Sequence, residues 1–266
     1  MPEPDYVWLP RTDILTFEEI DTLVDIFGKL GVDKVRLTGG EPLLRTDLPD
    51  LIALLAQKRS LCDLALTTNG ILLADQVTAL RAAGLPRLTV SLDTLQADRF
   101  KALTRIDSLD AVLRGLEMAV TSGFNSVKVD TVVIRGVNDD ELIPILEHGR
   151  ELGVEVRFIE YMDVGNTNQW RMDEVMPVGE ILELIDSYYP LRELESNYRG
   201  EVARRWEYCD GKGEIGMISS VSHPFCGDCT RARLSPEGKL YTCLFSSQGY
   251  RIVAFLDFYR TRSYFD

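Results

Sequence analysis

Three cysteines near the end of the sequence have the spacing of a metal site. Cys226 and Cys229 are separated by two residues, which places two thiolates on one tight turn, and Cys243 follows after 13 further residues. A hairpin turn over residues 234–239 would return Cys243 to the same place. Three thiolates without a fourth protein ligand leave a coordination position open, as in a cubane iron–sulfur cluster with one iron available to substrate. We therefore predict a 4Fe–4S cluster held by these three cysteines.

Zinc is the alternative metal for this site. A structural zinc ion is normally closed by four ligands, and His223 is the nearby candidate for the fourth. An odd, clustered set of cysteines does not resemble the paired disulfide framework of a small secreted domain. Cys62 and Cys209 stand apart from the cluster, and we expect them to be packing residues.

Glycine and polar residues close three successive apolar segments of the chain. Gly39 and Gly40 follow the first segment, Thr67 ends the second, and Ser91 ends the third. In α/β proteins with parallel strands, the carboxyl ends of the strands share one edge, where binding sites are built. The sequence therefore predicts a shared cleft at this edge.

Basic residues lie within the apolar segments themselves, where charge is rare unless it is paired or bound. They are Lys34, Arg36, Lys128 and Arg157. The candidate acidic partners are Glu41, Asp130 and Glu160. Just past the second cysteine, Arg231 and Arg233 are two residues apart and point the same way on an extended chain, and guanidinium forks suit phosphate oxygens. We predict an anion site that spans the apolar segments and the cysteine region.

Alternating helical and extended patterns position these residues over the first 190 positions. Short runs rich in Val, Leu and Ile predict parallel strands buried on both faces, with a helix between each pair. Thr16 and Glu19 form a capping-box signature at the first helix. The expected strands lie at 34–38, 64–68, 88–92, 127–134 and 154–160, and the expected helices at 17–30, 48–57, 75–83, 109–122, 138–152 and 179–188. Five strands leave a barrel one strand short at its start.

The pattern changes at about residue 164. A loop is expected at 166–172, and two strands across 202–220 joined by a turn at 210–213. We expect this C-terminal region to form a smaller subdomain that folds back over one end of the barrel.

Composition limits the class of protein. The 266 residues are 45% hydrophobic, with no apolar run long enough to span a membrane and no signal-peptide pattern at the start, so we expect a cytoplasmic protein without membrane association. A net charge of −13 argues against a broad nucleic-acid-binding surface. A small phosphorylated ligand held by a few basic residues in one cavity remains compatible with that charge.

Together these motifs resemble the GTP 3′,8-cyclases of molybdenum cofactor biosynthesis, a family of radical S-adenosylmethionine enzymes. The matching segments are Gly-Gly-Glu-Pro at 39–42, Thr-Thr-Asn-Gly at 67–70, Ser-Leu-Asp at 91–93, and the three cysteines with their intervening arginines. The resemblance covers about residues 1–249. It implies an α/β fold, an incomplete (βα)6 TIM-type barrel whose first strand is absent here, with a C-terminal cysteine-containing subdomain. The implied domains are a partial barrel at 1–163, an iron–sulfur and substrate subdomain at 164–249, and a divergent tail at 250–266.

The resemblance also implies a role for each matched residue. The cysteines would hold a second 4Fe–4S cluster whose open iron meets guanine, and S-adenosyl-L-methionine would contact Gly40, Ser91 and Met162. GTP would contact Arg36, Thr67, Lys128, Arg231, Ala232 and Arg233. The implied reaction abstracts a ribose hydrogen and closes a ring onto guanine C8, giving (8S)-3′,8-cyclo-7,8-dihydroguanosine 5′-triphosphate. A cyclic pyranopterin monophosphate synthase would act downstream, and a homodimer is compatible with the family.

The sequence departs from the family pattern at both ends and at one interior position. The family holds its first cluster with a CxxxCxxC motif, which these residues do not contain, and Met1 and Pro2 match the two residues that usually follow it. Residues 250–266 do not resemble the family's continuation, and Asp130 stands where the family usually has Asn. We interpret the sequence as a cyclase cut at both ends, by a misplaced start and a frameshift, and expect no radical formation from it alone. The alternatives are a non-catalytic module that binds GTP and an iron–sulfur cluster, and another radical enzyme with an auxiliary cluster.

Overall fold

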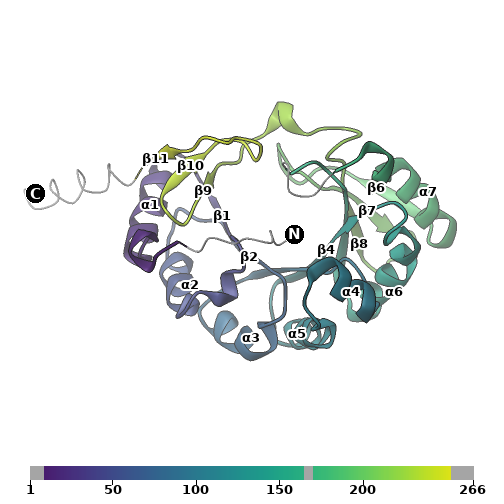
Figure 1. Ribbon diagram of the computed structural model, residues 1–266, viewed down its shortest axis with the longest axis horizontal. Coiled ribbons are helices and arrows are strands. Elements are labelled where there is room, and N and C mark those ends of the chain that lie inside the picture. The colour runs from purple at the N-terminus through teal and green to yellow at the C-terminus, as the bar shows by residue number, and fades with distance from the viewer. Residues whose placement is uncertain (1–8, 165–169, 253–266) are drawn as a thin grey trace, which may run out of the picture.

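The strands of the computed structural model, which describes residues 9–164 and 170–252, form a curved sheet with helices on its outer side (Figure 1). Eight strands lie in one sheet in the order β1-β2-β3-β4-β5-β8-β7-β6. Their bounds are β1 Lys34–Leu37, β2 Asp63–Thr68, β3 Arg87–Ser91, β4 Ser126–Val133, β5 Glu155–Glu160, β6 Leu191–Leu194, β7 Arg204–Tyr208 and β8 Glu214–Ile218. Strands β1 to β5 and β8 run parallel, whereas β7 and β6 pair antiparallel at one edge. The predicted incomplete TIM-type barrel is confirmed.

Seven helices in the described ranges cover the outer side of this sheet (Figure 1). They are α1 Phe17–Lys29, α2 Leu48–Ala56, α3 Leu73–Ala82, α4 Ala97–Thr104, α5 Leu109–Thr121, α6 Leu142–Leu152 and α7 Val178–Tyr188. Between helices and sheet lies one apolar core that includes Ile52, Leu66, Val90 and Phe158. The six predicted helices are present, and the Thr16–Glu19 capping box is confirmed. The sequence did not indicate α4, in which Phe100 alone is buried, nor the short edge strand β6.

Several parallel strands present apolar side chains to the helices and charged or hydroxyl side chains to the inside of the barrel. In β1, Val35 and Leu37 pack against the outer core, whereas Lys34 and Arg36 alternate with them and face inward. The in-register pairing of the parallel strands carries this division from strand to strand. The part of the inner wall around Arg36 therefore carries hydroxyl and charged side chains.

The chain after β8 crosses the open side of the barrel, and its last described residues lie beside α1 (Figure 1). There β9 (Arg233–Leu234), β10 (Lys239–Tyr241) and β11 (Tyr250–Arg251) form a small antiparallel sheet, which confirms the predicted hairpin over 234–239. The backbone N–H of Leu15 donates to the Pro236 carbonyl at 2.8 Å, and a small apolar cluster joins Leu15 and Leu23 to Leu234 and Ile252. These contacts dock the hairpin onto α1.

The change of pattern at residue 164 is not a break in the sheet. The two predicted strands across 202–220 are β7 and β8, joined at the predicted turn, but β8 pairs in parallel with β5 and so continues the barrel. The division into 1–163 and 164–249 stays a prediction. Most of the predicted loop at 166–172 and of the tail at 250–266 lies outside the described residues. Within the described ranges, the helices are all too short or too polar to cross a bilayer.

Candidate functional site

Arg36 is the first of several cations on the inner wall. Its Nη1 donates to Thr67 Oγ1 at 2.8 Å and to Thr89 Oγ1 at 3.2 Å, which ties three neighbouring strands together. Burial, which removes hydration from the charged form, lowers the pKa of the Arg36 guanidinium, although the nearby Asp130 carboxylate acts in the opposite direction. An arginine side chain stays protonated at neutral pH despite such a shift. The predicted neighbours Arg36 and Thr67 are therefore in direct contact.

A second group of charges lies on the neighbouring strands β4 and β5. Lys128, which is 9% exposed, forms an ion pair with Glu155, and Arg157 Nε donates to the other oxygen of Glu155 at 2.7 Å. Burial and the neighbouring Arg157 lower the pKa of Lys128. Burial opposes ionisation of Glu155, but Arg157 and Lys128 together lower the pKa of this carboxyl below its ordinary value. Two cations share one carboxylate, so the group keeps a net positive charge.

Two of the acidic residues considered as partners of these cations, Glu41 and Glu160, have other partners. Glu41 accepts the Thr68 hydroxyl and the Asn69 N–H, both at 2.7 Å, so it fixes the turns that follow β1 and β2. Glu160 is fully buried and accepts backbone N–H groups, among them that of Val178 at 2.8 Å. Glu155, which sequence reasoning missed, is instead the acidic partner of Lys128 and Arg157.

The carboxyl ends of the strands carry the residues expected to contact S-adenosylmethionine. Gly39 has a φ of 146°, a conformation that favours glycine, and the space beyond the Cα of Gly40 is open. Ser91 is exposed at the end of β3, and Met162 is half-buried two residues after β5. These residues follow parallel strands and therefore lie along the same edge of the sheet, as predicted.

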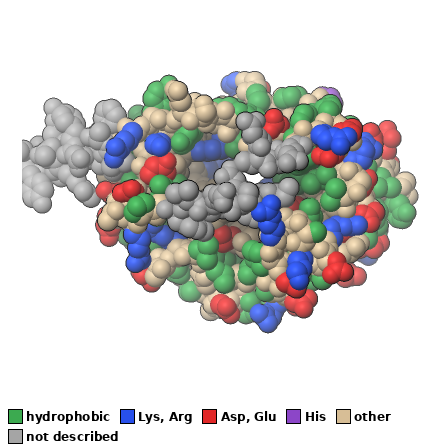
Figure 2. All heavy atoms as spheres, in the orientation of Figure 1, with side chains coloured by type: hydrophobic (Ala, Val, Ile, Leu, Met, Phe, Trp, Pro, Cys, Tyr) green, Lys and Arg blue, Asp and Glu red, His purple; other side chains and the backbone are tan. Residues whose placement is uncertain are grey.

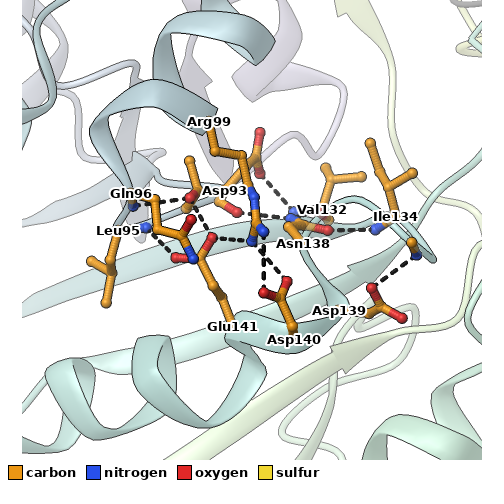
Figure 3. A network of polar contacts seen from close by, with 12 residues as sticks. Asp93, Leu95, Gln96, Arg99, Val132, Ile134, Asn138, Asp139, Asp140 and Glu141 are labelled. Carbon is orange, nitrogen blue, oxygen red and sulfur yellow. Dashed lines mark hydrogen bonds and ion pairs between the residues drawn. The ribbon is translucent and has the colours of Figure 1, made fainter.

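A polar network fixes the loops that follow β4 and β3, the strand that ends at Ser91 (Figure 3). Asn138 Nδ2 donates to the carbonyls of Asp93 at 2.7 Å and Val132 at 2.8 Å, and the Val132 N–H donates to Asp93 Oδ1 at 2.8 Å. Glu141 accepts the Leu95 N–H at 2.7 Å and also pairs with Arg99. Burial raises the pKa of Asp93 to about 6. Sequence reasoning singled out Asp93 only as part of the Ser-Leu-Asp motif and missed the network itself, because its other members are ordinary loop residues whose contacts depend on the tertiary fold.

The cysteine region has the donor chemistry that a cluster needs. Cys226, Cys229 and Cys243 are exposed free thiols, the first two on a 3-10 turn. In the hairpin, Arg233 pairs with Tyr241 at the end of the ladder, and Cys243 follows Tyr241 by two residues. Hydrogen bonds from the backbone and side chain of Arg231 lower the pKa of Cys229, with Nη2 3.5 Å from Sγ. Thiolate character at the end of a hairpin fits iron ligation.

Nearby, the ring of His223, the candidate fourth zinc ligand, lies 3.3 Å from Ser222 Oγ. In the part of the chain that the structure describes, no three His, Cys, Asp or Glu side chains converge as ligands of a single metal ion. A cubane binds each thiolate through a different iron, so its three cysteines must still surround one cluster.

Residues 196–201 connect the cysteine turn to the barrel wall. Lys34 Nζ lies 3.2 Å from the centre of the Tyr198 ring, and Arg199 pairs with Asp228 at 3.1 Å. Between this segment and the turn at 224–228 is a pocket of about 530 Å³. Arg231 stacks over the Phe225 ring at 4.7 Å, and both Arg231 and Arg233 act on Cys229 electrostatically. Figure 2 shows basic side chains within a hollow in the middle of this face of the molecule.

The structure thus brings the predicted residues together in two groups rather than one. Arg36, Thr67 and Lys128 lie on the barrel wall, where Arg157 joins them, whereas Arg231, Ala232 and Arg233 accompany the cysteines. Residues 196–201 bridge the two groups. Cys62 and Cys209 are both exposed, so the expectation that they serve as packing residues is wrong.

Comparison with known proteins matches both parts of the chain. Residues 5–149 match the model of the radical SAM superfamily, and residues 154–263 match that of Molybdenum Cofactor Synthesis C. The GTP 3′,8-cyclase of Acidothermus cellulolyticus is 51% identical over 248 residues, which are 93% of this chain and 68% of that protein. The chain belongs to the GTP 3′,8-cyclase family. The family's enzyme from Xanthomonas axonopodis is also 51% identical, over 93% of this chain and 74% of its own length.

Solved structures agree with the barrel of this family member. Streptococcus suis SuiB, in its structure bound to S-adenosylmethionine, superposes with a TM-score of 0.66 at 13% sequence identity. The superposition covers 92% of this chain and 58% of SuiB. At this low identity the likeness concerns the fold alone.

Proposed function

We propose that this chain binds GTP inside the barrel and a 4Fe–4S cluster at its C-terminal hairpin, as the substrate-holding part of a GTP 3′,8-cyclase in molybdenum cofactor biosynthesis. The observation that carries the proposal is the pair of cationic groups described above. One lines the barrel wall around Arg36, and the other flanks the cysteine turn. A nucleotide offers complementary chemistry at its two ends, because its triphosphate seeks cations and its base can meet an open iron.

The barrel group suits a triphosphate. Arg36 is held by hydroxyl acceptors from Thr67 and Thr89 and makes no ion pair in the described structure, so its charge stays available to an anion. Lys128 and Arg157 share a single carboxylate. Charge-assisted hydrogen bonds to phosphate oxygens are among the strongest that proteins make. The surface of the protein stays acidic while this wall is basic.

The edge of the barrel suits the cofactor, with Gly40, Ser91 and Met162 as its contacts. Bound there, S-adenosylmethionine with a reduced cluster would supply the radical that abstracts a ribose hydrogen in the cyclase reaction. Here the barrel would orient the ribose, and the hairpin would hold the base, so that ring closure onto guanine C8 follows. Such positioning can lower a barrier by several kcal/mol, on the order of 7–11 at most. The product would pass to a cyclic pyranopterin monophosphate synthase.

The 266 residues contain no CxxxCxxC motif, and we propose that they do not generate the radical by themselves. This observation also favours a second candidate function, a non-catalytic module that binds GTP and an iron–sulfur cluster. The DNA before the Met1 codon distinguishes the two. An in-frame CxxxCxxC there supports the cyclase, whereas an in-frame stop codon close to Met1 supports the binding module.

Titration calorimetry with GTP tests the barrel site. We expect Arg36→Ala to weaken GTP binding by about ten- to a hundredfold, the effect of losing a charge-assisted hydrogen bond. Arg114→Ala removes an exposed arginine of α5 and serves as the matched control. Equal affinities in the wild type and Arg36→Ala would remove the barrel wall as the phosphate site.

Metal analysis tests the hairpin site. After anaerobic reconstitution with iron and sulfide, the chain should hold about four irons, as a cubane requires. Cys229→Ser and Cys243→Ser should lose most of this iron and its visible absorption, whereas Cys62→Ser should keep both. One tightly bound zinc per chain in place of iron would refute the cluster assignment.

A further inference from the structure

Segment 196–201, between β6 and β7, is tied to the sheet at both of its ends. Arg205 of β7, whose side chain is 13% exposed, pairs with Glu201 at 3.6 Å and donates from Nη2 to the Glu195 carbonyl at 2.8 Å. The backbone N–H of Asn197 donates to Glu201 Oε2 at 2.7 Å. Arg205 is itself held by Glu214 on β8 at 2.9 Å. One guanidinium therefore anchors the whole segment to the edge of the barrel.

Gly200 is the residue through which this segment meets the cysteine turn. Its φ is +80°, a conformation that favours glycine. A Cβ at this position would lie 2.9 Å from the carbonyl oxygen of Asp228 and 3.2 Å from Thr230 Oγ1. Asp228 and Thr230 are the chain neighbours of Cys229 on either side. Because a Cβ essentially never comes so close to a carbonyl oxygen, any other residue would push the segment and the turn apart.

The other contacts of the segment do not fix this separation as firmly. Arg199 pairs with Asp228 at 3.1 Å, but the two side chains are 88% and 64% exposed, and ion pairs so open to water contribute little. Tyr198 lies on the opposite side of the contact, with Lys34 Nζ 3.2 Å from the centre of its ring on the barrel wall. The backbone contact at Gly200 therefore sets the distance between the wall and the cysteine turn.

We propose that Gly200 is a positioning residue for the cluster, which fixes Cys229 relative to the barrel wall by letting segment 196–201 pack against both chain neighbours of that cysteine. Arg205 is the anchor that holds the segment in place. This inference rests on the proposed function, in which an iron of the hairpin cluster faces a nucleotide inside the barrel. Groups that surround the ligands of a metal centre govern how tightly it is held and at what potential it is reduced.

The full chain, reconstituted anaerobically with iron and sulfide, tests this assignment. Gly200→Ala adds one Cβ at the contact. Gly211→Ala is the matched control, because Gly211 has a φ of +75° and nothing within 4 Å of an added Cβ, so both variants carry similar backbone strain and only one meets the turn. Arg205→Lys keeps the positive charge and loses the fork that reaches both Glu195 and Glu201. The measurements are the rate of iron loss to a chelator and the midpoint potential of the cluster.

We expect Gly200→Ala to lose iron about tenfold faster than Gly211→Ala or more, and to show a displaced midpoint potential. Gly211→Ala should match the wild type in both, and Arg205→Lys should change in the same sense as Gly200→Ala. Equal rates and potentials in Gly200→Ala and Gly211→Ala would overturn the inference while leaving the cluster assignment intact. If Gly200→Ala does not fold, Arg205→Lys decides, and wild-type values in that variant would overturn the inference. A wild-type chain that takes up no iron would overturn the proposed cluster and this inference with it.

Discussion

At the scale of single residues, Asp93 is the carboxylate whose state depends most clearly on its surroundings. It follows β3 directly, receives the Val132 N–H at 2.8 Å, and contributes its own carbonyl to Asn138. Burial outweighs this one hydrogen bond and raises its pKa from the ordinary 3.8 to about 6. The ionised form is thus tolerated rather than favoured in the folded protein, because one donor replaces only part of the lost hydration.

This shift predicts a pH-dependent stability with a definite sign. Between pH 3.8 and 6 the folded protein holds the Asp93 proton more tightly than the unfolded chain does, so this group's contribution to stability falls as the pH rises and levels off above about 7. At pH 7 the cost is on the order of 2–3 kcal/mol. Asp93→Asn keeps an acceptor for the Val132 N–H and abolishes the titration. The free energy of unfolding of Asp93→Asn should therefore gain on that of the wild type as the pH rises. The difference, variant minus wild type, should be about 2 kcal/mol larger at pH 7 than at pH 4.5.

Urea unfolding of both proteins at the two pH values measures this difference, because all other titrating groups are common to both and cancel. A stability difference that does not change with pH would show that Asp93 ionises normally in the folded state.

At the scale of elements, the hydrophobic pattern predicted the parallel strands and six of the outer helices, since both depend on apolar spacing along the chain. It could not predict which charges meet across strands. The partner of Lys128 is Glu155, one strand away in the sheet, and this pairing follows from a register that only the fold sets. For the same reason, the position of β8 could not be predicted. Its short apolar run is the same whether the strand extends the barrel sheet or belongs to a separate subdomain. The cysteines and their arginines were recognisable because their spacing is local.

Glu160 is the residue that joins three elements near the cysteine region. It ends β5, is fully buried, and accepts the backbone N–H groups of Val178 at 2.8 Å, Val221 at 2.7 Å and Ser222 at 2.8 Å. It thereby holds the start of α7 and the segment that leads to Cys226. Burial acts against ionisation, but the donors from Ser222, Val178 and Val221 lower the pKa of Glu160.

We expect Glu160→Gln to reduce the free energy of unfolding by about 2–3 kcal/mol, because its amide nitrogen faces N–H donors and cannot accept from them. Glu117→Gln, on the exposed side of α5, changes charge in the same way without such contacts and should alter stability by less than about 0.5 kcal/mol. Chemical denaturation of the two variants at pH 7 makes the comparison. If Glu160→Gln lost no more stability than Glu117→Gln, the N–H groups of Val178, Val221 and Ser222 would be hydrogen-bonding to water in the variant.

At the scale of the whole molecule, the barrel is closed by contacts rather than by a strand. Strand β1 at one end of the sheet and β6 at the other are not paired to each other in the described structure. The chain from β8 crosses the space between them and docks its hairpin on α1 (Figure 1). Tyr198, in the segment between β6 and β7, covers Lys34 on the inner wall. The position of the cysteine region therefore depends on the contacts that hold the hairpin on α1.

Leu23, 3% exposed on α1, is the residue through which this closure can be tested. Its side chain belongs to the small apolar cluster with Leu15 and Leu234, apart from the main core. Leu23→Ala should cost about 2–4 kcal/mol at this contact, and because the cluster is separate, the loss should fall on the hairpin before the barrel. Hydrogen exchange should quicken at the Leu15 N–H, which donates to Pro236, while Val90 in β3 keeps its protection.

The control is Leu54→Ala, at a 39% exposed position of α2, which should change the exchange rate at neither residue. If exchange rose equally at Leu15 and Val90, the hairpin and barrel would unfold as one unit, and closure would be part of the barrel's own stability rather than a separate docking step.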